Sequence, residues 1–266
     1  MTKQLMIYGE VAPVNKKKHL DLSVKTGVNY EFARCVNAVP LMAIEFPNAA
    51  PEYPIVFAGK DENVMPIAIL GIKEQQNLFV ADDGSMDAKY IPAFLRRYPF
   101  VFSTADDGSS FVLCIDESFD GCNRTGIGER LFDAEGEQSQ YLKGMLQFLR
   151  EYQAHFARTQ LFCKKLSELD LLEPVGAQFT PPKGERRTLT GFMAINRQKL
   201  QSLTGEQYQE LAKTGELELA YIHIQSLRNF TFIMERAKQK EPDKKETPSE
   251  KMKKNSDDEK IPEETS

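Results

Sequence analysis

The sequence predicts an α+β fold with a mainly antiparallel, β-rich N-terminal half, one inserted helix, a helical C-terminal half and a disordered tail. In the first half, short apolar runs alternate with glycine, proline, asparagine and aspartate, a pattern typical of strands joined by turns. In the second half, apolar residues recur at helical spacing. Strands grouped before helices favour an α+β fold over an alternating arrangement of strands and helices.

The expected strands of the first half are short, and prolines flank most of them. Because proline lacks the N–H group that a central strand needs, it belongs at strand ends and edges. The segment 86–98 is expected to form the inserted helix, with Pro92 in its first turn, where a missing N–H is harmless. The expected strands are residues 5–8, 42–46, 55–58, 67–72, 78–80, 100–102 and 111–115.

The second half is expected to begin with a long amphipathic helix over residues 138–166. A strand over 189–195, a short helical pair between Leu200 and Leu211, and a final helix over 217–236 follow. Residues 1–236 are expected to form a single domain. Residues 237–266 contain eight lysines, nine acidic residues and three prolines, so we expect a disordered, charged tail.

Composition and net charge exclude some classes of function and favour a cellular location. Of the 266 residues, 41% are hydrophobic, and the formal charge is −5, which argues against general binding of nucleic acid. No apolar run approaches the roughly 20 residues that cross a bilayer, and the N-terminus does not resemble a signal peptide. We therefore expect a cytoplasmic protein with no membrane span. The four cysteines have no C-x-x-C spacing and are expected to be unpaired thiols; no cofactor is expected.

The most distinctive segment for binding runs from Tyr90 to Phe100 and contains adjacent Arg96 and Arg97 between Tyr90 and Tyr98. A guanidinium group can pair bidentately with a carboxylate or phosphate, and it can stack on tyrosine rings. These four residues are the candidates for contact with a small anionic ligand or a protein partner. The alternative is a packed helix whose arginines form structural ion pairs.

A weaker pattern suggests a metal site. His19 and Asp21 form an H-x-D triplet, which in non-haem iron oxygenases provides two of three ligands. His223 or His155 would have to provide the third. The alternative is that these histidines are bonded locally, His223 at the edge of the core. Gly126 and Gly128 lack the remainder of a nucleotide-binding motif and are expected to form a turn.

The order of several motifs resembles the SapC family of bacterial proteins. The resemblance covers about residues 5–235, and the segment from Tyr90 to Phe100 is its most specific part. Members often carry a tryptophan near Met86, whereas this chain has none. The other matching motifs are His19-Leu20-Asp21-Leu22, Tyr30-Glu31-Phe32-Ala33, Val39-Pro40-Leu41, Glu45-Phe46, Tyr53-Pro54-Ile55-Val56-Phe57, Leu70-Gly71, Leu78-Phe79-Val80, residues 128–136 with Leu131-Phe132, and residues 189–227 beginning Leu189-Thr190-Gly191-Phe192.

The resemblance implies an association with bacterial surface layers, and with outer-membrane uptake receptors and flavin-dependent halogenase-like proteins. It carries over no catalytic residues. The leading hypothesis is a cytoplasmic, non-enzymatic accessory or binding protein of SapC type. Two alternatives stay open: a non-haem iron oxygenase-like enzyme that uses His19 and Asp21, and a structural protein of a surface layer.

Overall fold

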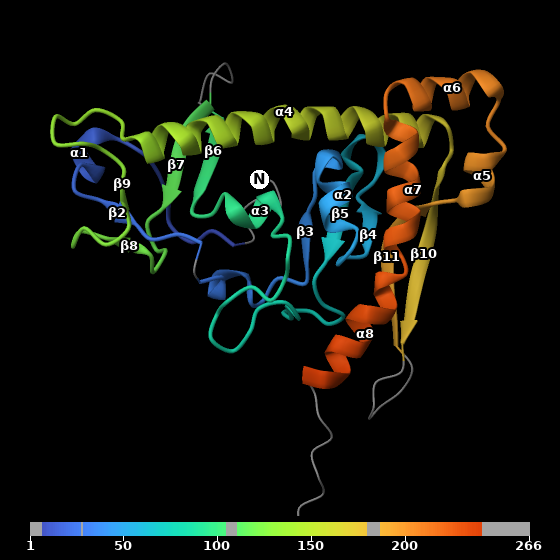
Figure 1. Cartoon of the computed structure of the whole chain (residues 1–266), viewed down its shortest axis with the longest axis horizontal. Coiled ribbons are helices and arrows are strands. Elements are labelled where there is room, and N and C mark those ends of the chain that lie inside the picture. The colour runs from blue at the N-terminus through green and yellow to red at the C-terminus, as the bar shows by residue number, and fades with distance from the viewer. Residues whose placement is uncertain (1–6, 28, 105–110, 180–186, 241–266) are drawn as a thin grey trace, which may run out of the picture.

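The computed structural model describes residues 7–27, 29–104, 111–179 and 187–240, and the strands in these ranges pair into three sheets (Figure 1). Each of these pairings is antiparallel, which confirms the predicted α+β class. One three-stranded sheet has the order β1 (Val11–Pro13), β7 (Phe111–Asp116), β6 (Phe100–Thr104). The five-stranded sheet has the order β10 (Leu172–Phe179), β11 (Arg187–Ile195), β4 (Ile55–Ala58), β5 (Met65–Ile69), β3 (Ala38–Pro40). The third sheet consists of short strands in the order β8 (Cys122–Asn123), β2 (Ser23–Val24), β9 (Glu129–Arg130).

Helix α4 (Gln140–Glu168) runs along most of the long axis of the molecule, from the sheets β1-β7-β6 and β8-β2-β9 to the five-stranded sheet (Figure 1). Ser139 begins it, because its hydroxyl group accepts a hydrogen bond from the N–H of Leu142. The other helical segments are α1 (Lys16–His19), α2 (Phe46–Ala49), α3 (Ala93–Arg96), α5 (Arg197–Gln201), α6 (Gly205–Lys213), α7 (Glu216–Ser226), α8 (Asn229–Lys240) and the 3-10 turns η2 (Glu31–Ala33), η3 (Ala43–Glu45) and η4 (Asp61–Asn63).

The buried face of α4 enters all three clusters of the hydrophobic core. Leu142 and Leu149 pack beside the β1-β7-β6 sheet, in the cluster that contains Phe100. Tyr152 lies in a small middle cluster, and Phe162 packs in the large cluster around the five-stranded sheet. The apolar periodicity that predicts this helix therefore also determines how the two ends of the molecule are joined.

Several predicted elements are confirmed with shifts at their ends: β4, β6, β7, β11, α4 and the pair α5 and α6. The predicted strand 67–72 is β5, which ends at Ile69. Residues 78–80 form only a single bridge, between Val80 and Met86. Ile7 and Tyr8 lie outside any strand, and residues 5 and 6 of that predicted strand are outside the described ranges. Gly126 and Gly128 have positive φ angles of 78° and 92°, as a glycine-dependent turn requires.

Two segments of the first half differ from the prediction. Residues 42–46 are not a strand but form η3 and the start of α2, because the Glu45 carboxylate accepts the N–H of Met42 and closes a helical turn. The helix predicted over 86–98 is limited to α3, which begins directly after Pro92. A residue before proline is disfavoured in the helical conformation, so Ile91 cannot easily extend the helix backwards.

The predicted helix 217–236 is divided into α7 and α8. The Ser226 hydroxyl group donates to the carbonyl of His223 and accepts the N–H of Ile55, while the Asn229 amide donates to the carbonyls of Ala50 and Tyr53. These bonds tie the break between the helices to the segment before β4. Strand β10 was missed because Pro174 indicated an end rather than a strand.

Helix α8 continues to Lys240, so the first four residues of the predicted tail are helical, and Ala237 is buried. The remainder of that tail prediction lies outside the described residues. None of the helices in the described ranges combines the length and apolar character that a bilayer span requires.

Replacement of Phe162 by alanine is expected to lower the free energy of unfolding by about 3–5 kcal/mol, because this fully buried ring would leave a cavity beside the five-stranded sheet. The adjacent Leu161 has 67% of its surface exposed, so Leu161→Ala on the same helix is the matched control, with a change within about 0.5 kcal/mol. Urea unfolding measures both. Equal losses would contradict the assignment of the buried face.

Candidate functional site

The segment that carries the candidate arginines is held in place by two carboxylates. The N–H of Ala93, at the start of α3, donates to Oε1 of Glu45 over 2.8 Å, and the N–H of Tyr90 donates to Oε2 of Glu52 over 2.9 Å. These carboxylates satisfy N–H groups that the short helix leaves unpaired. Because neighbouring residues of a helix project about 100° apart, Arg96 and Arg97 at its end point in different directions.

Arg97 points into the protein and is only 3% exposed. The central carbon of its guanidinium group lies 4.4 Å from the ring centre of Phe94, 4.8 Å from that of Tyr152 and 5.8 Å from that of Tyr8. Its Nε and Nη2 atoms have no hydrogen-bond partner among the described residues. The alternative of a structural ion pair is therefore not what holds Arg97; aromatic ring faces surround the cation instead.

Arg96 points outward and is exposed. Its guanidinium carbon lies 5.7 Å from the ring centre of Tyr90 and 5.3 Å from that of Phe148. Its Nε atom donates to the carbonyl of Ile91 over 2.9 Å, which orients the group. No described residue pairs with Nη1, so that edge of the guanidinium group is free to donate to a ligand.

Tyr90 and Arg96 line a pocket of about 320 Å³ between α3, η3 and α4. Its walls are fixed by internal hydrogen bonds: buried Glu45 accepts from the Tyr90 hydroxyl group over 2.7 Å, and Thr159 of α4 accepts from the N–H of Ala43 over 2.9 Å. Burial and the adjacent Glu45 raise the pKa of Tyr90, so its hydroxyl group stays protonated at neutral pH. The remaining lining residues are Met42, Ile44, Asn48, Ala93, Phe148, Glu151, Tyr152 and His155.

Tyr98 does not belong to this pocket. Its ring stacks on Phe32 at 4.0 Å between centres, and its hydroxyl group donates to Oδ2 of Asp116 over 3.1 Å. It lines a second pocket, of about 390 Å³, together with Phe119. The structure thus brings Tyr90 and Arg96 together, places Arg97 in the interior, and separates Tyr98 from them.

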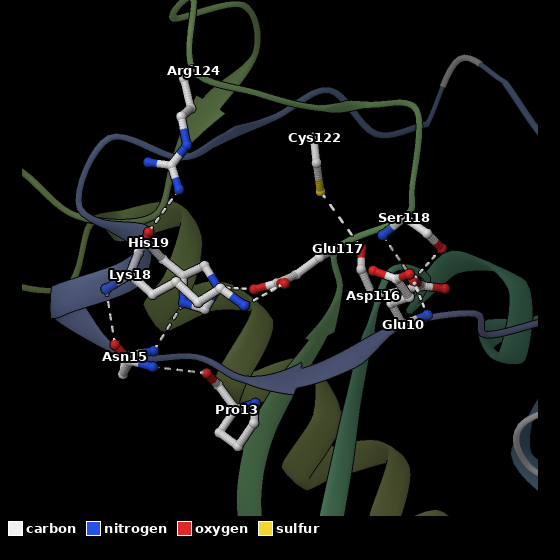
Figure 2. A network of polar contacts seen from close by, with 10 residues as sticks. All are labelled: Glu10, Pro13, Asn15, Lys18, His19, Asp116, Glu117, Ser118, Cys122 and Arg124. Carbon is white, nitrogen blue, oxygen red and sulfur yellow. Dashed lines mark hydrogen bonds and ion pairs between the residues drawn. The ribbon is translucent and has the colours of Figure 1, made fainter.

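His19 of α1 is 1% exposed, and both of its ring nitrogens are engaged (Figure 2). Nδ1 accepts the N–H of Asn15 over 3.1 Å, so Nε2 carries the proton and donates to Oε1 of Glu117 over 2.7 Å. The other oxygen of Glu117 accepts from Lys18 over 2.5 Å. Hydrogen bonds from Lys18 and His19 lower the pKa of Glu117. These contacts make His19 part of a local network, with no ring nitrogen left for a metal ion.

The other metal candidates lie elsewhere. Asp21 is exposed, and its carboxylate is 3.8 Å from Arg130. His223 is on α7, and α1 and α7 lie near opposite ends of α4 (Figure 1). Nε2 of His223 accepts the N–H of Ile195 over 3.1 Å, which is the local bond that the alternative predicted, but the ring is fully buried in the core rather than at its edge, and its Nδ1 has no partner among the described residues. Within the described ranges, no three histidine, cysteine or acidic side chains are arranged as metal ligands.

Sequence reasoning missed the carboxylates that organise both pockets. Glu45 lies inside the apolar run 42–46, and a charged residue in such a run was a signal that could have been used. Asp116 follows the apolar run of β7 directly, and Glu117 comes next. Their roles depend on partners about 50 to 100 residues away, for example Ala93 for Glu45 and Gly9 for Asp116, which spacing along the chain does not show.

The comparisons with known proteins identify a family over most of the chain. The family model described as SapC matches residues 14–232. No curated protein and no solved structure matches the chain.

Replacement of Arg97 by methionine is expected to leave the free energy of unfolding unchanged or to raise it by up to about 2 kcal/mol, because it removes a desolvated cation whose Nε and Nη2 atoms lack hydrogen-bond partners among the described residues, while the volume between the rings stays filled. Arg97→Ala, which leaves that volume empty, is expected to cost about 2–3 kcal/mol. Urea unfolding distinguishes the two. A large loss in the methionine variant would mean that the charge itself stabilises the fold.

His223 is expected to make stability dependent on pH. Burial lowers its pKa to about 3, below the value of about 6.5 in an unfolded chain, so the unfolded chain binds one more proton between these values. Stability from this residue is present above pH 6.5 and is lost as the pH falls, by about 2 kcal/mol between pH 7 and pH 5.

The variant His223→Gln keeps an acceptor for the N–H of Ile195 but does not titrate. Urea unfolding at the two pH values should therefore show a smaller loss in the variant than in the wild type. An equal loss in both proteins would show that His223 does not cause it.

Proposed function

Because the chain belongs to the SapC family, we propose that it is a non-enzymatic accessory protein that binds a small anionic ligand or a protein partner through the pocket of Arg96 and Tyr90. The observation that carries the proposal is the free Nη1 edge of Arg96, held between two aromatic rings at the mouth of a pre-formed pocket. The preferred ligand group is a carboxylate or phosphate, which a guanidinium group contacts through two hydrogen bonds.

The charges around the pocket are balanced: the cations of Arg96 and Arg97 offset the carboxylates of Glu45 and Glu151, and the hydrogen-bond capacity left for an anion is that of Arg96. Arg96 is the one arginine or lysine among the described residues that line it. The carboxylate of Glu45 is already occupied by the N–H groups of Met42 and Ala93 and by the Tyr90 hydroxyl group. Glu151 accepts a hydrogen bond from Gln147 over 2.8 Å. Arg97 adds a second positive charge behind the ring of Tyr152, which itself lines the pocket.

The proposal extends to the cellular setting. The protein would act in the bacterial cytoplasm, in a system for nutrient uptake or for assembly of a surface layer, as the resemblance to the family implies. Of the two alternatives, the oxygenase requires His19 to release one of its two hydrogen bonds and to meet a ligand from elsewhere in the fold. The surface-layer alternative requires the protein to be part of the cell envelope.

The variant Arg96→Ala is expected to weaken binding of the partner or ligand at least tenfold, since a charge-assisted hydrogen bond contributes about 1.5–3 kcal/mol. Wild-type protein is used as bait in lysate of the source cells, and the affinity of the purified partner is then measured by titration. The exposed Arg150→Ala on α4 is the matched control. Equal affinity of Arg96→Ala, with an unchanged unfolding transition, would remove this pocket from consideration.

Fractionation of the source cells tests the proposed cytoplasmic location independently of the binding experiment. The protein is expected in the soluble fraction after lysis, and recovery with the washed cell envelope would favour the surface-layer alternative.

A further inference from the structure

The second pocket, of about 390 Å³, has aromatic walls. The rings of Phe32 and Phe119 are perpendicular to one another, with 6.4 Å between their centres, and both are partly exposed. Tyr98, 4.0 Å from Phe32 and 5.1 Å from Phe119, closes the space between them and is nearly buried. Three ring faces and edges therefore meet at one concave site on the surface.

A buried negative charge lies directly behind this site. Asp116 is 0% exposed and accepts five hydrogen bonds: from the N–H groups of Gly9, Glu10 and Ser118 and from the hydroxyl groups of Ser118 and Tyr98. Figure 2 shows those from Glu10 and Ser118. Burial acts to raise its pKa, but these hydrogen bonds outweigh burial and hold the pKa below its usual value. No lysine, arginine or histidine among the described residues forms an ion pair with Asp116.

The hydrogen bond from the Tyr98 hydroxyl group to Asp116 makes the tyrosine ring at the pocket wall more electron-rich. A phenol that donates to a carboxylate gains electron density, and the face of an aromatic ring is already its negative part. The hydroxyl groups of Tyr98 and Ser118 both touch Asp116, and both residues line the pocket. A positive charge in the pocket would therefore meet negative ring faces with an uncompensated carboxylate behind them.

The charges at the rim are nearly balanced. Asp120 has no partner among the described residues, whereas the Glu31 carboxylate is occupied by two hydrogen bonds from Arg34. Lys25 is the opposing cation at the rim, and it is exposed. The buried Asp116 adds its charge to that of Asp120, so the site as a whole is negative.

We propose that this pocket binds an organic cation, specifically an alkylated ammonium group, against the exposed parts of Phe32 and Phe119. Methyl groups on nitrogen suit the aromatic walls, and their spread positive charge suits the ring faces. A hard metal ion suits them less, because it requires several free oxygen ligands and those of Asp116 are occupied. The inference is independent of the proposed function at Arg96, which concerns an anion in a different pocket.

Choline and its uncharged analogue 3,3-dimethyl-1-butanol provide the direct test, because they have nearly the same shape and differ in charge. Calorimetry or NMR titration of the full chain is expected to show saturable binding of choline in the millimolar range or tighter, with the analogue at least tenfold weaker. Equal binding of both compounds would show a merely apolar pocket and would overturn the proposal. So would the absence of saturable choline binding.

Variants locate the site. Phe119→Leu keeps an apolar side chain but removes the ring, and it should weaken choline about 2- to 30-fold, the range expected for one cation–π contact. Lys25→Gln removes the opposing cation and should tighten binding. Phe148→Leu, in the Arg96 pocket, is the control and should leave choline binding unchanged.

Unfolding transitions of all variants are compared first. If Phe119→Leu is unfolded, Asp120→Asn on the exposed rim replaces it, with a predicted weakening of choline binding. Unchanged affinity in a folded Phe119→Leu or Asp120→Asn protein, or weaker binding by Lys25→Gln, would overturn the proposal.

Discussion

The apolar stripe of α4 is the constraint on which the arrangement of the chain depends. This helix contributes Leu149 to the cluster beside the β1-β7-β6 sheet, Tyr152 to the middle cluster and Phe162 to the large cluster around the five-stranded sheet. Burial of apolar surface on this scale is the main favourable term in folding. The orientation of α4 consequently sets how the β1-β7-β6 sheet and the five-stranded sheet lie relative to one another. It also positions the Arg96 pocket, because Phe148, Glu151, Tyr152 and His155 of α4 form part of its wall.

Two desolvated charges of opposite sign lie near one another without forming an ion pair. Arg97 is enclosed by ring faces, and Asp116 by hydrogen-bond donors. Between them lie the rings of Tyr8 and Tyr98, 5.2 Å apart. Burial raises the pKa of Tyr8 to about 12, while the charge of Arg97 acts to lower it and that of Asp116 to raise it. Each charge thus keeps an outward electrostatic effect that a direct pair would cancel.

The same kind of contact holds the walls of both pockets in place. In each, a buried carboxylate accepts backbone N–H groups from a segment distant in the chain: Glu45 from Ala93, and Asp116 from Gly9. Such charge-assisted bonds are among the stronger ones in proteins, and they fix loops that have little secondary structure of their own. The pockets are therefore formed before a ligand arrives, which lowers the entropic cost of binding.

Local patterns in the sequence determined the fold class, the antiparallel pairing, the long helix and the strands β4, β6, β7 and β11, because hydrophobic periodicity reports which face is buried. They also identified the segment with Arg96 and the family. Only the tertiary structure decided that Arg97 is internal, that Tyr98 faces Asp116, and that His19 and His223 lie apart. These outcomes depend on contacts between residues far apart in the chain, and the spacing of residues along a sequence carries no record of such contacts.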